Sequence, residues 1–578
     1  MHSAAALPGF LAVRRRDGAD DTSVSPADRV TNLICGPVEL AYWGVPSLDS
    51  TVAALSLSRV TRTRHGETST SAIVAALASD PGSLGGLLPP FAAARGDSDG
   101  VCMVADSMGF RQLYHSSVDG GPAVLSTSAL LAGWKRSADF DPAAVAVQSQ
   151  LGWQIGQRTL LSGVEKLVPG GIARLDADGL HVTTESPSVE PEIPLRAAVH
   201  EAAKVLRDSM EALLDDHPGA VLQLTGGQDS RLLLSAVPVA RRRGLRAMTL
   251  GVPGAGDVTV AAHLAERYGL NHEVHGLADL DDVTPGEAWT MVRQAALRLD
   301  GMSDPIALAA LGVAERNFDQ GVRISGLGGE VARGFYYMGR VRDRTFTRRD
   351  AERLASWRMF VNEAVEVESL EPEFARWARE SAVDSVYDAL VSGGNEWFRA
   401  TDELYLRHRM QRWAGVTDTA VAYDRVVINP MLDEDFLRIA TRMTPRDKAA
   451  SRFLGALQME LDPELGRIPL EGRPAPIAYA QPNLRSSARR TLSTARRAAS
   501  KARQRLRRGN RAPAGGSTLT TKIVEHWRLH PELVLTAGVP AFFSPAWIEG
   551  VLDGRVEPQP SSVAFLTNLL VARPPLDT

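Results

Sequence analysis

The chain is poor in cysteine and contains no long apolar run. Its 578 residues include two cysteines, Cys35 and Cys102, which are too few for a disulfide framework and are not spaced as a CxxC pair. No stretch of about 18 apolar residues is present, so the sequence predicts no membrane-spanning helix and no membrane partner. The first ten residues lack the charged and apolar regions of a secretion signal. We therefore expect a cytoplasmic protein.

Acidic residues are missing from one stretch near the carboxyl end. Residues 483–517 contain eleven Lys and Arg and no Asp or Glu, although the whole chain has a net charge of −4. Small and apolar residues recur there every three or four positions, which predicts a basic helix with one narrow apolar face. Three interpretations stay open: a solvated surface helix, a docking site for an acidic carrier protein or precursor peptide, and a nucleic-acid contact. Nucleic acid is the least favoured, because aromatic residues are missing there.

The rest of the chain divides into three parts by pattern. Residues 1–185 have short apolar runs punctuated by Gly and Pro, which predicts an antiparallel α+β sandwich. Residues 195–480 alternate strands with helices, which indicates a doubly wound parallel α/β domain with a helical extension from about residue 348. Residues 185–194, rich in Pro and Glu, are predicted to link these two domains. Residues 518–578 are predicted to form a carboxy-terminal helical segment.

A glycine-rich turn gives the strongest functional signal. Residues 225–231, TGGQDSR, follow an apolar strand and precede an apolar helix. Glycines there let the backbone approach a ligand, and the N–H groups at the helix start form a cradle for an anion. Hydroxyl groups come from Thr225 and Ser230, and Asp229 can hold Mg²⁺ on phosphate oxygens. An ordinary turn with two glycines is the alternative, but the whole string favours a nucleotide-phosphate site. No lysine follows as in GxxxxGK[ST], which favours adenylation over γ-phosphate transfer.

A second glycine-rich loop lies at the end of another predicted strand. Residues 325–330, SGLGGE, sit where parallel α/β sheets bind ligands. Its glycines allow close approach to a nucleotide, and Glu330 would supply a second carboxylate for Mg²⁺, opposite Asp229. Arg333 can neutralise a leaving phosphate. The alternative is a loop that carries a solvated glutamate.

Together these loops resemble the asparagine synthetase B family over residues 1 to about 480. The family joins an Ntn-hydrolase-like glutaminase domain to an ATP-pyrophosphatase domain, and its SGGxDS and SGxGxDE loops correspond to 225–230 and 325–331. Further similarities lie at 106–109, 126–128, 168–170 and 429–433. The resemblance implies ATP and Mg²⁺ as cofactors. It implies an ATP and pyrophosphate site formed by Leu224, Thr225, Gly226, Gly227, Asp229, Ser230, Leu250, Ser325 and Gly326, with Asp229 and Glu330 as metal ligands.

The sequence also departs from the family at positions that matter. The family's glutaminase begins with a cysteine directly after Met, and His2 stands there instead. We therefore expect a degenerate glutaminase-like domain, with Cys35 as a buried thiol. Leu327 and Val331 replace acidic residues of the second loop, which favours relatives that form lactams or join peptides, such as beta-lactam synthetases and lasso-peptide cyclases.

Those relatives imply late catalytic residues. They often use a lysine to stabilise the tetrahedral intermediate; Arg473 is the candidate cation near 468–474, and Lys448 matches a lysine element of the family. Tyr336 is the candidate for deprotonating an amine, with Tyr337 and Glu363 as weaker candidates.

Several other polar residues receive weaker expectations. Asp257 is expected to be an N-cap of its helix. Asp300 and Asp304 are expected near an acceptor pocket. His272 and His275 lack the further carboxylates that would indicate a metal site.

The expected function is that of an ATP-dependent amide-bond-forming ligase, a carbon–nitrogen ligase of specialised metabolism that releases AMP. Its substrates would be a carboxylate and an amine, either small molecules or peptides. One alternative is an asparagine synthase that uses ammonia or glutamine. Another is a catalytically inactive binding protein that retains the fold.

Overall fold

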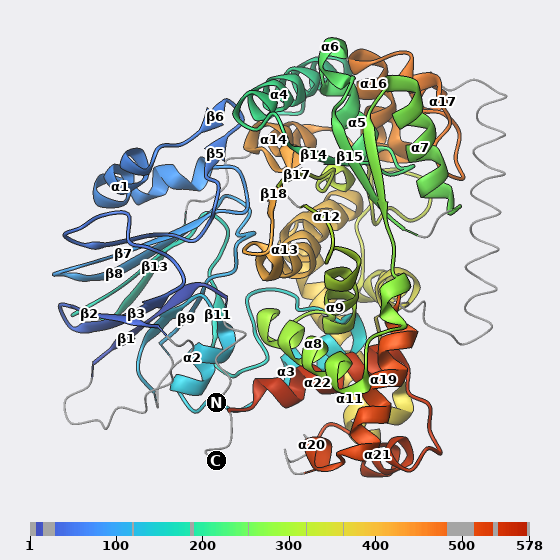
Figure 1. Ribbon diagram of the computed structural model, residues 1–578. Helices are drawn as coiled ribbons and strands as arrows, with labels where there is room; N and C mark the ends of the chain where they lie inside the picture. The colour runs from blue at the N-terminus through green and yellow to red at the C-terminus, as the bar shows by residue number, and fades with distance from the viewer. Residues whose placement is uncertain are drawn as a thin grey trace.

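The computed structural model describes residues 7–15, 29–117, 121–184, 190–251, 254–319, 321–361, 363–481, 514–535 and 541–574 (Figure 1). The predicted basic helix at 483–517 falls outside these residues as far as residue 513. Among the described helices, none is long and apolar enough to cross a membrane.

The amino-terminal part consists of two antiparallel sheets that enclose one core. The six-stranded sheet has the order β11-β9-β10-β1-β3-β2 and the five-stranded sheet the order β13-β12-β8-β7-β4. Their bounds are β1 (Gly9–Arg14), β2 (Thr31–Cys35), β3 (Val38–Trp43), β4 (Ala53–Ser56), β7 (Ala92–Asp97), β8 (Gly100–Ala105), β9 (Tyr114–Ser116), β10 (Val124–Ser126), β11 (Glu165–Lys166), β12 (Ile172–Asp176) and β13 (Leu180–Thr183); a separate ribbon pairs β5 (Arg62–Thr63) with β6 (Gly66–Glu67).

Alternation along these strands explains the layering. Ala92 and Ala94 of β7 face the core between the sheets, whereas Ala93 faces the other side, as the two-residue period of a strand requires. On that side the sheet is covered by Ile73 and Leu77 of α1 (Thr70–Ser79). The outer face of the six-stranded sheet packs against α2 (Ala129–Lys135) and α3 (Pro142–Leu151). The predicted antiparallel α+β sandwich is confirmed.

A parallel sheet organises the second part of the chain. Its order is β16-β15-β14-β17-β18, with bounds β14 (Val221–Gln223), β15 (Arg246–Leu250), β16 (Asn271–His275), β17 (Val322–Ile324) and β18 (Val426–Ile428). The chain moves outward from β14 to β16 and then returns to the other side of β14 with β17. The strand order therefore reverses between β14 and β17, which is where open α/β sheets bind ligands.

Helices cover this sheet and extend it. Leu222 and Ile324 share a core with α4 (Leu195–Asp216), α5 (Asp229–Ala236), α7 (Gly256–Tyr268) and α16 (Arg452–Leu461), while Val221 and Met248 face Phe318 on the other side. The predicted parallel α/β domain with a helical extension is confirmed. The remaining helices of this part are α6 (Val239–Arg242), α8 (Pro285–Arg298), α9 (Pro305–Ala314), α10 (Arg348–Leu354), α11 (Pro372–Ser392), α12 (Trp397–Leu404), α13 (Gly415–Val421), α14 (Glu434–Arg442), α15 (Pro445–Lys448) and α17 (Ile477–Ala480).

The carboxy-terminal helices pack at the foot of the molecule in Figure 1, on α8 and α9. Trp527 and Trp289 meet edge to face there, with ring centroids 5.7 Å apart. The helices are α19 (Gly516–Leu529), α20 (Glu532–Leu535), α21 (Pro545–Leu552) and α22 (Pro560–Ala572).

The two main parts are joined by buried hydrogen bonds. The Arg111 guanidinium donates to the carbonyl oxygen of Thr419 at 3.2 Å, and the backbone N–H of Gln112 donates to the Thr419 hydroxyl at 3.3 Å. The described end of the predicted linker, 190–194, is also packed: the Ile193 N–H donates to the carbonyl of Arg442 at 3.1 Å. Because buried polar groups need partners, these contacts fix the sandwich against the helical half.

Candidate functional site

The first glycine loop joins β14 to α5 and is braced from within. Leu224, the residue before it, is fully buried. The Thr225 N–H donates to the Ser230 hydroxyl and the Gly227 N–H donates to the Thr225 hydroxyl, both at 3.1 Å. The Gly226 N–H donates to a carboxylate oxygen of Asp257 at 3.0 Å. One amide of the predicted anion cradle therefore already binds an anionic oxygen.

That contact corrects the expectation for Asp257. Helix α7 has Ala255 at its N-cap, and Asp257 lies in the first turn, where a negative charge favours the helix dipole. Asp257 thus joins the start of α7 to the glycine loop and does not cap its own helix.

The two glycine loops touch at backbone distance. A Cβ added to Gly326 would lie 2.8 Å from the Ser230 nitrogen, and one added to Gly329 would lie 2.3 Å from Oδ1 of Asp229. Only glycine fits at such a distance. The second loop is held by the Ser325 N–H, which donates to the carbonyl of Ile428 in β18 at 2.9 Å. The structure therefore brings together the two loops that the sequence places about 100 residues apart.

Two carboxylates and an arginine form the centre of this contact. Nη1 of Arg333 lies 3.4 Å from Oδ2 of Asp229, and Nη2 lies 2.8 Å from Oε1 of Glu330. Within the described part of the chain, Oδ1 of Asp229 and Oε2 of Glu330 are buried and have no hydrogen-bond partner. Burial, followed by the charge of Asp229, raises the pKa of Glu330 to about 7, against the opposing effect of Arg333.

This arrangement fits a divalent cation. Buried carboxylate oxygens that lack a partner are costly, and hard oxygen ligands are those that Mg²⁺ prefers. Asp229 and Glu330 would supply two ligands, and substrate phosphates and water would supply the rest. No group of three or more His, Cys, Asp or Glu side chains that could hold a metal occurs among the described residues. His272 therefore belongs to no such group among these residues, and its Nε2 lies 2.8 Å from the Thr249 hydroxyl.

The segment that carries Arg473 lies against the first loop. The Glu471 N–H donates to the carbonyl of Gly226 at 2.9 Å. Arg231 of α5 is fully buried behind it. Burial, followed by the positive charge of Arg473, lowers the pKa of Arg231 to about 10. The backbone segment of Arg473 therefore lies against the first loop, while the catalytic role of Arg473 stays a prediction.

Lys448 belongs to a buried cluster that the sequence did not indicate. Its Nζ lies 2.8 Å from Oδ2 of Asp402, and the Tyr337 hydroxyl donates to the same oxygen at 2.9 Å. Burial raises the pKa of Asp402, while Lys448 opposes that effect. Burial, followed by Asp402, raises the pKa of Tyr337 far above its usual value. The lysine is therefore charge-paired, and the phenol stays protonated.

Tyr336, the predicted base, lies elsewhere. Its ring packs on Phe335 and Tyr405, with centroids 5.1 and 5.8 Å away, and burial raises its pKa while Arg409 opposes the rise. Glu363 pairs with the same Arg409, at 3.5 Å. It is Tyr337, the weaker candidate, that contacts the Lys448 cluster.

Several other predicted residues have structural positions. Leu250 ends β15 and is partly buried. Asp304 caps α9 by accepting from the N–H groups of Ile306 and Ala307. Asp300 accepts from the Ser128 hydroxyl at 2.5 Å, across the boundary between the two main parts. Their contacts are those of a helix cap and a domain contact, and the expected acceptor-pocket role of both residues stays a prediction.

Cys35 is buried in the core of the sandwich, at the end of β2. Burial, followed by Asp97, raises the pKa of its thiol. A thiol in that state is a poor nucleophile, which agrees with the expectation of a structural cysteine. The predicted absence of glutaminase activity stays a prediction.

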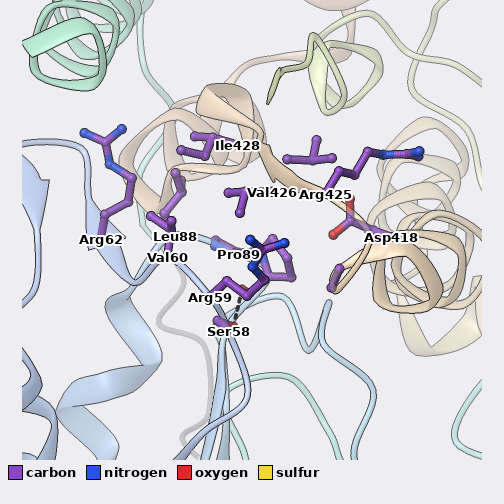
Figure 2. Close-up of a pocket in the computed structure, with 13 residues that line it drawn as sticks. Ser58, Arg59, Val60, Arg62, Leu88, Pro89, Asp418, Arg425, Val426 and Ile428 are labelled. Carbon is purple, nitrogen blue, oxygen red and sulfur yellow. Dashed lines mark hydrogen bonds between the residues drawn. The ribbon is translucent and has the colours of Figure 1, made fainter. Parts of the chain in front are cut away.

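A small hollow opens between the sandwich and the helical half. Figure 2 shows Asp418 and Arg62 on opposite sides, with Arg59 between them. The lining is otherwise mainly apolar: Val60, Leu88, Pro89, Pro90, Ala422, Val426, Val427 and Ile428. The hollow includes none of the glycine-loop residues, so it is distinct from the site above.

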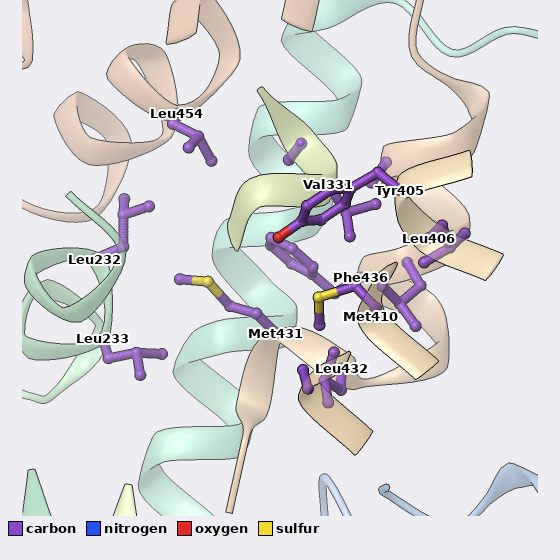
Figure 3. Close-up of a cluster of buried hydrophobic side chains, with 14 of the residues drawn as sticks. Leu232, Leu233, Val331, Tyr405, Leu406, Met410, Met431, Leu432, Phe436 and Leu454 are labelled. Atoms are coloured by element: carbon purple, nitrogen blue, oxygen red, sulfur yellow. The ribbon is translucent and has the colours of Figure 1, made fainter. Parts of the chain in front are cut away.

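The two glycine loops pack on a continuous apolar core. Figure 3 shows Leu232 and Leu233 of α5, Val331 of the second loop, and Met431 and Leu432 after β18 around one cluster. Rigid packing of this kind holds side chains in place. The loops are therefore anchored on the core and not on the surface.

Comparisons with known proteins give little beyond this geometry. No protein-family model matches the sequence, and no curated protein matches it. A search of solved structures returns the glutamine phosphoribosylpyrophosphate amidotransferase of B. subtilis complexed with ADP and GMP, at 11% identity over 47% of this chain and 61% of that chain, with a TM-score of 0.20. It also returns a structure described as the allosteric regulatory enzyme of purine biosynthesis, at 12% identity over 47% of this chain and 60% of that chain, with a TM-score of 0.19.

The chain therefore spans about three-fifths of the length of these two structures. Similarity at this level carries no information on the chemistry of this chain. The resemblance to the asparagine synthetase B family stays a prediction.

Proposed function

We propose that this chain is an ATP-dependent ligase that adenylates a carboxylate and transfers the acyl group to an amine. The observation that supports it most is the contact between the two glycine loops at the reversal of the strand order. There, Asp229 and Glu330 face one Arg333, and within the described ranges of the chain each keeps one oxygen without a hydrogen-bond partner. Mg²⁺ bound by these two carboxylates would neutralise charge on the phosphates of ATP.

In the first step of this proposal, a substrate carboxylate oxygen attacks the α-phosphorus of ATP. The bond between the α-phosphorus and the bridging oxygen breaks, and pyrophosphate leaves. The amides at 226–228 and the Ser230 hydroxyl would bind the departing anion, as helix starts do, once the Gly226 and Gly227 amides release Asp257 and Thr225. Arg333 and Arg473 would stabilise the negative charge of pyrophosphate, because hydrogen bonds between charged groups are stronger than those between neutral groups.

In the second step, an amine nitrogen attacks the acyl carbon, the bond to AMP breaks, and an amide forms. The amine must lose a proton. Asp402 is the proposed acceptor, with the Tyr337 hydroxyl as the relay, since the two are hydrogen bonded at 2.9 Å. Lys448 would favour the ionised form of Asp402, against the effect of burial, and would oppose negative charge as the intermediate forms.

The second loop supports an amine supplied by a substrate rather than ammonia. Val331, which replaces an acid of the resembled family, is buried in the apolar core of Figure 3. Leu327 is partly buried against the same core. The absence of both acids from the second loop favours a lactam, isopeptide or other amide product over asparagine.

The test is pyrophosphate release from ATP over a panel of carboxylates and amines. Asp229→Asn is expected to abolish release while the protein stays folded, because it removes a charge from the metal site. Asp215→Asn is the matched control, since Asp215 is an exposed residue of α4 paired with Arg241. Wild-type release by Asp229→Asn would contradict the proposal.

A binding protein without catalysis is the second candidate, and the contact between Asp257 and Gly226 favours it. A carboxylate on that amide competes with a phosphate for the same donor. Calorimetry with ATP and Mg²⁺ separates the two candidates when combined with the release assay. Binding without pyrophosphate release from any substrate pair would favour the binding protein.

A further inference from the structure

Arg231 is a fully buried arginine directly behind the first glycine loop, two residues after Asp229. Buried arginines usually face a carboxylate. Among the ion pairs of the described residues, none includes Arg231. Its Nη1 donates to the carbonyl of Ile468 at 2.5 Å and its Nη2 to the carbonyl of Pro469 at 3.0 Å. The guanidinium is thus hydrogen bonded to two backbone carbonyls.

The segment to which Arg231 is hydrogen bonded continues to a contact with the glycine loop. Three residues past Ile468, the Glu471 N–H donates to the carbonyl of Gly226 at 2.9 Å. Glu471 lies so close that its Cβ would be 2.7 Å from a Cβ on Gly226. Residues 468–473 therefore lie against both the loop and the helix that follows it.

The same segment ends in a tight turn that presents Arg473. The Arg473 N–H donates to the carbonyl of Leu470 at 3.2 Å, and Gly472 has a φ of +54°, which favours glycine. Arg473 is close enough to repel the charge of Arg231. Two guanidinium groups so near a phosphate cradle create positive potential where an anion would be stabilised.

We infer that Arg231 is a positioning residue, which fixes residues 468–473 on the glycine loop and thereby places Arg473 at the phosphate end of the site. Arg231 acts only through this segment, because its own side chain is wholly enclosed. The role of Arg473 rests on the proposed function; the fixing of the segment does not.

The planar guanidinium explains why arginine is needed. It donates to two carbonyls at once in a fixed fork, whereas lysine is a point charge with a single nitrogen. Arg231→Lys keeps the charge and loses the fork. Arg242→Lys is the matched control: Arg242 is also buried, pairs with Asp462 at 2.5 Å and donates to the carbonyls of Ser235 and Val237 near the far end of α5.

The first measurement is hydrogen exchange of the full-length protein, followed at the Glu471 amide. In Arg231→Lys we expect exchange at least tenfold faster than in the wild type, and in Arg242→Lys no change at this amide. Unchanged protection in Arg231→Lys would overturn the inference, as would equal loss of protection in both variants. Should Arg231→Lys fail to fold, Arg231→Gln, which keeps a single donor group, is measured by the same criterion.

The second measurement is a double-mutant cycle on pyrophosphate release. Arg231→Lys is expected to lower kcat about tenfold with KM for ATP changed less than threefold. The double variant Arg231→Lys/Arg473→Gln is expected to be no slower than Arg473→Gln alone, since one residue acts through the other. Multiplied losses would show that Arg231 acts independently and would overturn the link to Arg473.

The two measurements separate this inference from the proposed function. A wild-type protein that neither binds nor cleaves ATP would refute the proposed function and the role of Arg473. The exchange of the Glu471 amide would still decide whether Arg231 fixes the segment.

Discussion

Replacing Gly329 by alanine tests whether close contact between the two loops sets the position of Asp229. An added Cβ would lie 2.3 Å from Oδ1 and 2.6 Å from Cγ of Asp229, closer than any real Cβ contact. Either the aspartate or the second loop must move. Overpacking of this kind costs about 1–3 kcal/mol.

If that cost falls on the catalytic arrangement, it corresponds to a loss of about 5-fold to 150-fold in turnover, since about 1.4 kcal/mol is a factor of ten. The assay is pyrophosphate release with saturating ATP and Mg²⁺, together with urea unfolding. Gly312→Ala is the control, because Gly312 lies in α9 and a Cβ there meets nothing within 4 Å. Helix propensity predicts a gain of about 1 kcal/mol in stability for the control. Wild-type turnover and metal dependence in Gly329→Ala would show that the contact between the loops does not set the position of Asp229.

Three further predictions follow from other contacts. The pKa of Glu330 is raised to about 7, so the folded protein holds a proton there between about pH 4.5 and pH 7. As the pH rises over that range, the contribution of Glu330 to stability without metal should fall. Mg²⁺ affinity should rise by up to roughly tenfold per pH unit up to pH 7 and then level off. Calorimetry should show Mg²⁺ affinity that does not change with pH in Glu330→Gln, and a pH-dependent affinity in that variant would contradict the assignment. Asp402→Asn leaves buried Lys448 without its partner and should cost about 3–5 kcal/mol in urea unfolding, most of it recovered in Asp402→Asn/Lys448→Met; a cost below about 1 kcal/mol would show that the pair is not buried as described. Cys35→Ala should leave ATP-dependent turnover unchanged because the thiol lies in the sandwich core, and a loss of turnover with the fold intact would contradict its structural role.

Much of the fold could be predicted from local patterns in the sequence. Short apolar runs punctuated by Gly and Pro predict the antiparallel sandwich over residues 1–185, and the structure places the alanines at 92–94 in two different cores of that sandwich. The parallel sheet followed from strands that alternate with helices. The strand-order reversal between β14 and β17 depends instead on pairing between distant segments, which no local pattern records.

The site was predictable where chemistry lies within one short string. Gly226, Gly227, Asp229 and Ser230 share such a string, and the structure gives them a common turn. Asp402 lies in the middle of a helical region with no motif around it, so its contact with Lys448 appears only after folding. Tyr336 and Tyr337 are neighbours in sequence, and only the backbone direction after Gly334 decides which of them reaches Asp402.

Asp257 illustrates a different limit. An aspartate at a helix start is usually a cap, but α7 begins at Gly256 with Ala255 as its N-cap, two residues before Asp257. The carboxylate is then free to reach the Gly226 amide on another strand's loop. Tertiary contact overrides the local rule here.

The central claim is tested most directly by a crystal structure with a non-hydrolysable ATP analogue and Mn²⁺. We expect an anomalous peak for Mn²⁺ between the carboxylates of Asp229 and Glu330, with the phosphate tail on the amides at 226–228 and Asp257 displaced from Gly226. A glycine loop that stays empty at saturating analogue, with Arg333 still bound to both carboxylates, would contradict it.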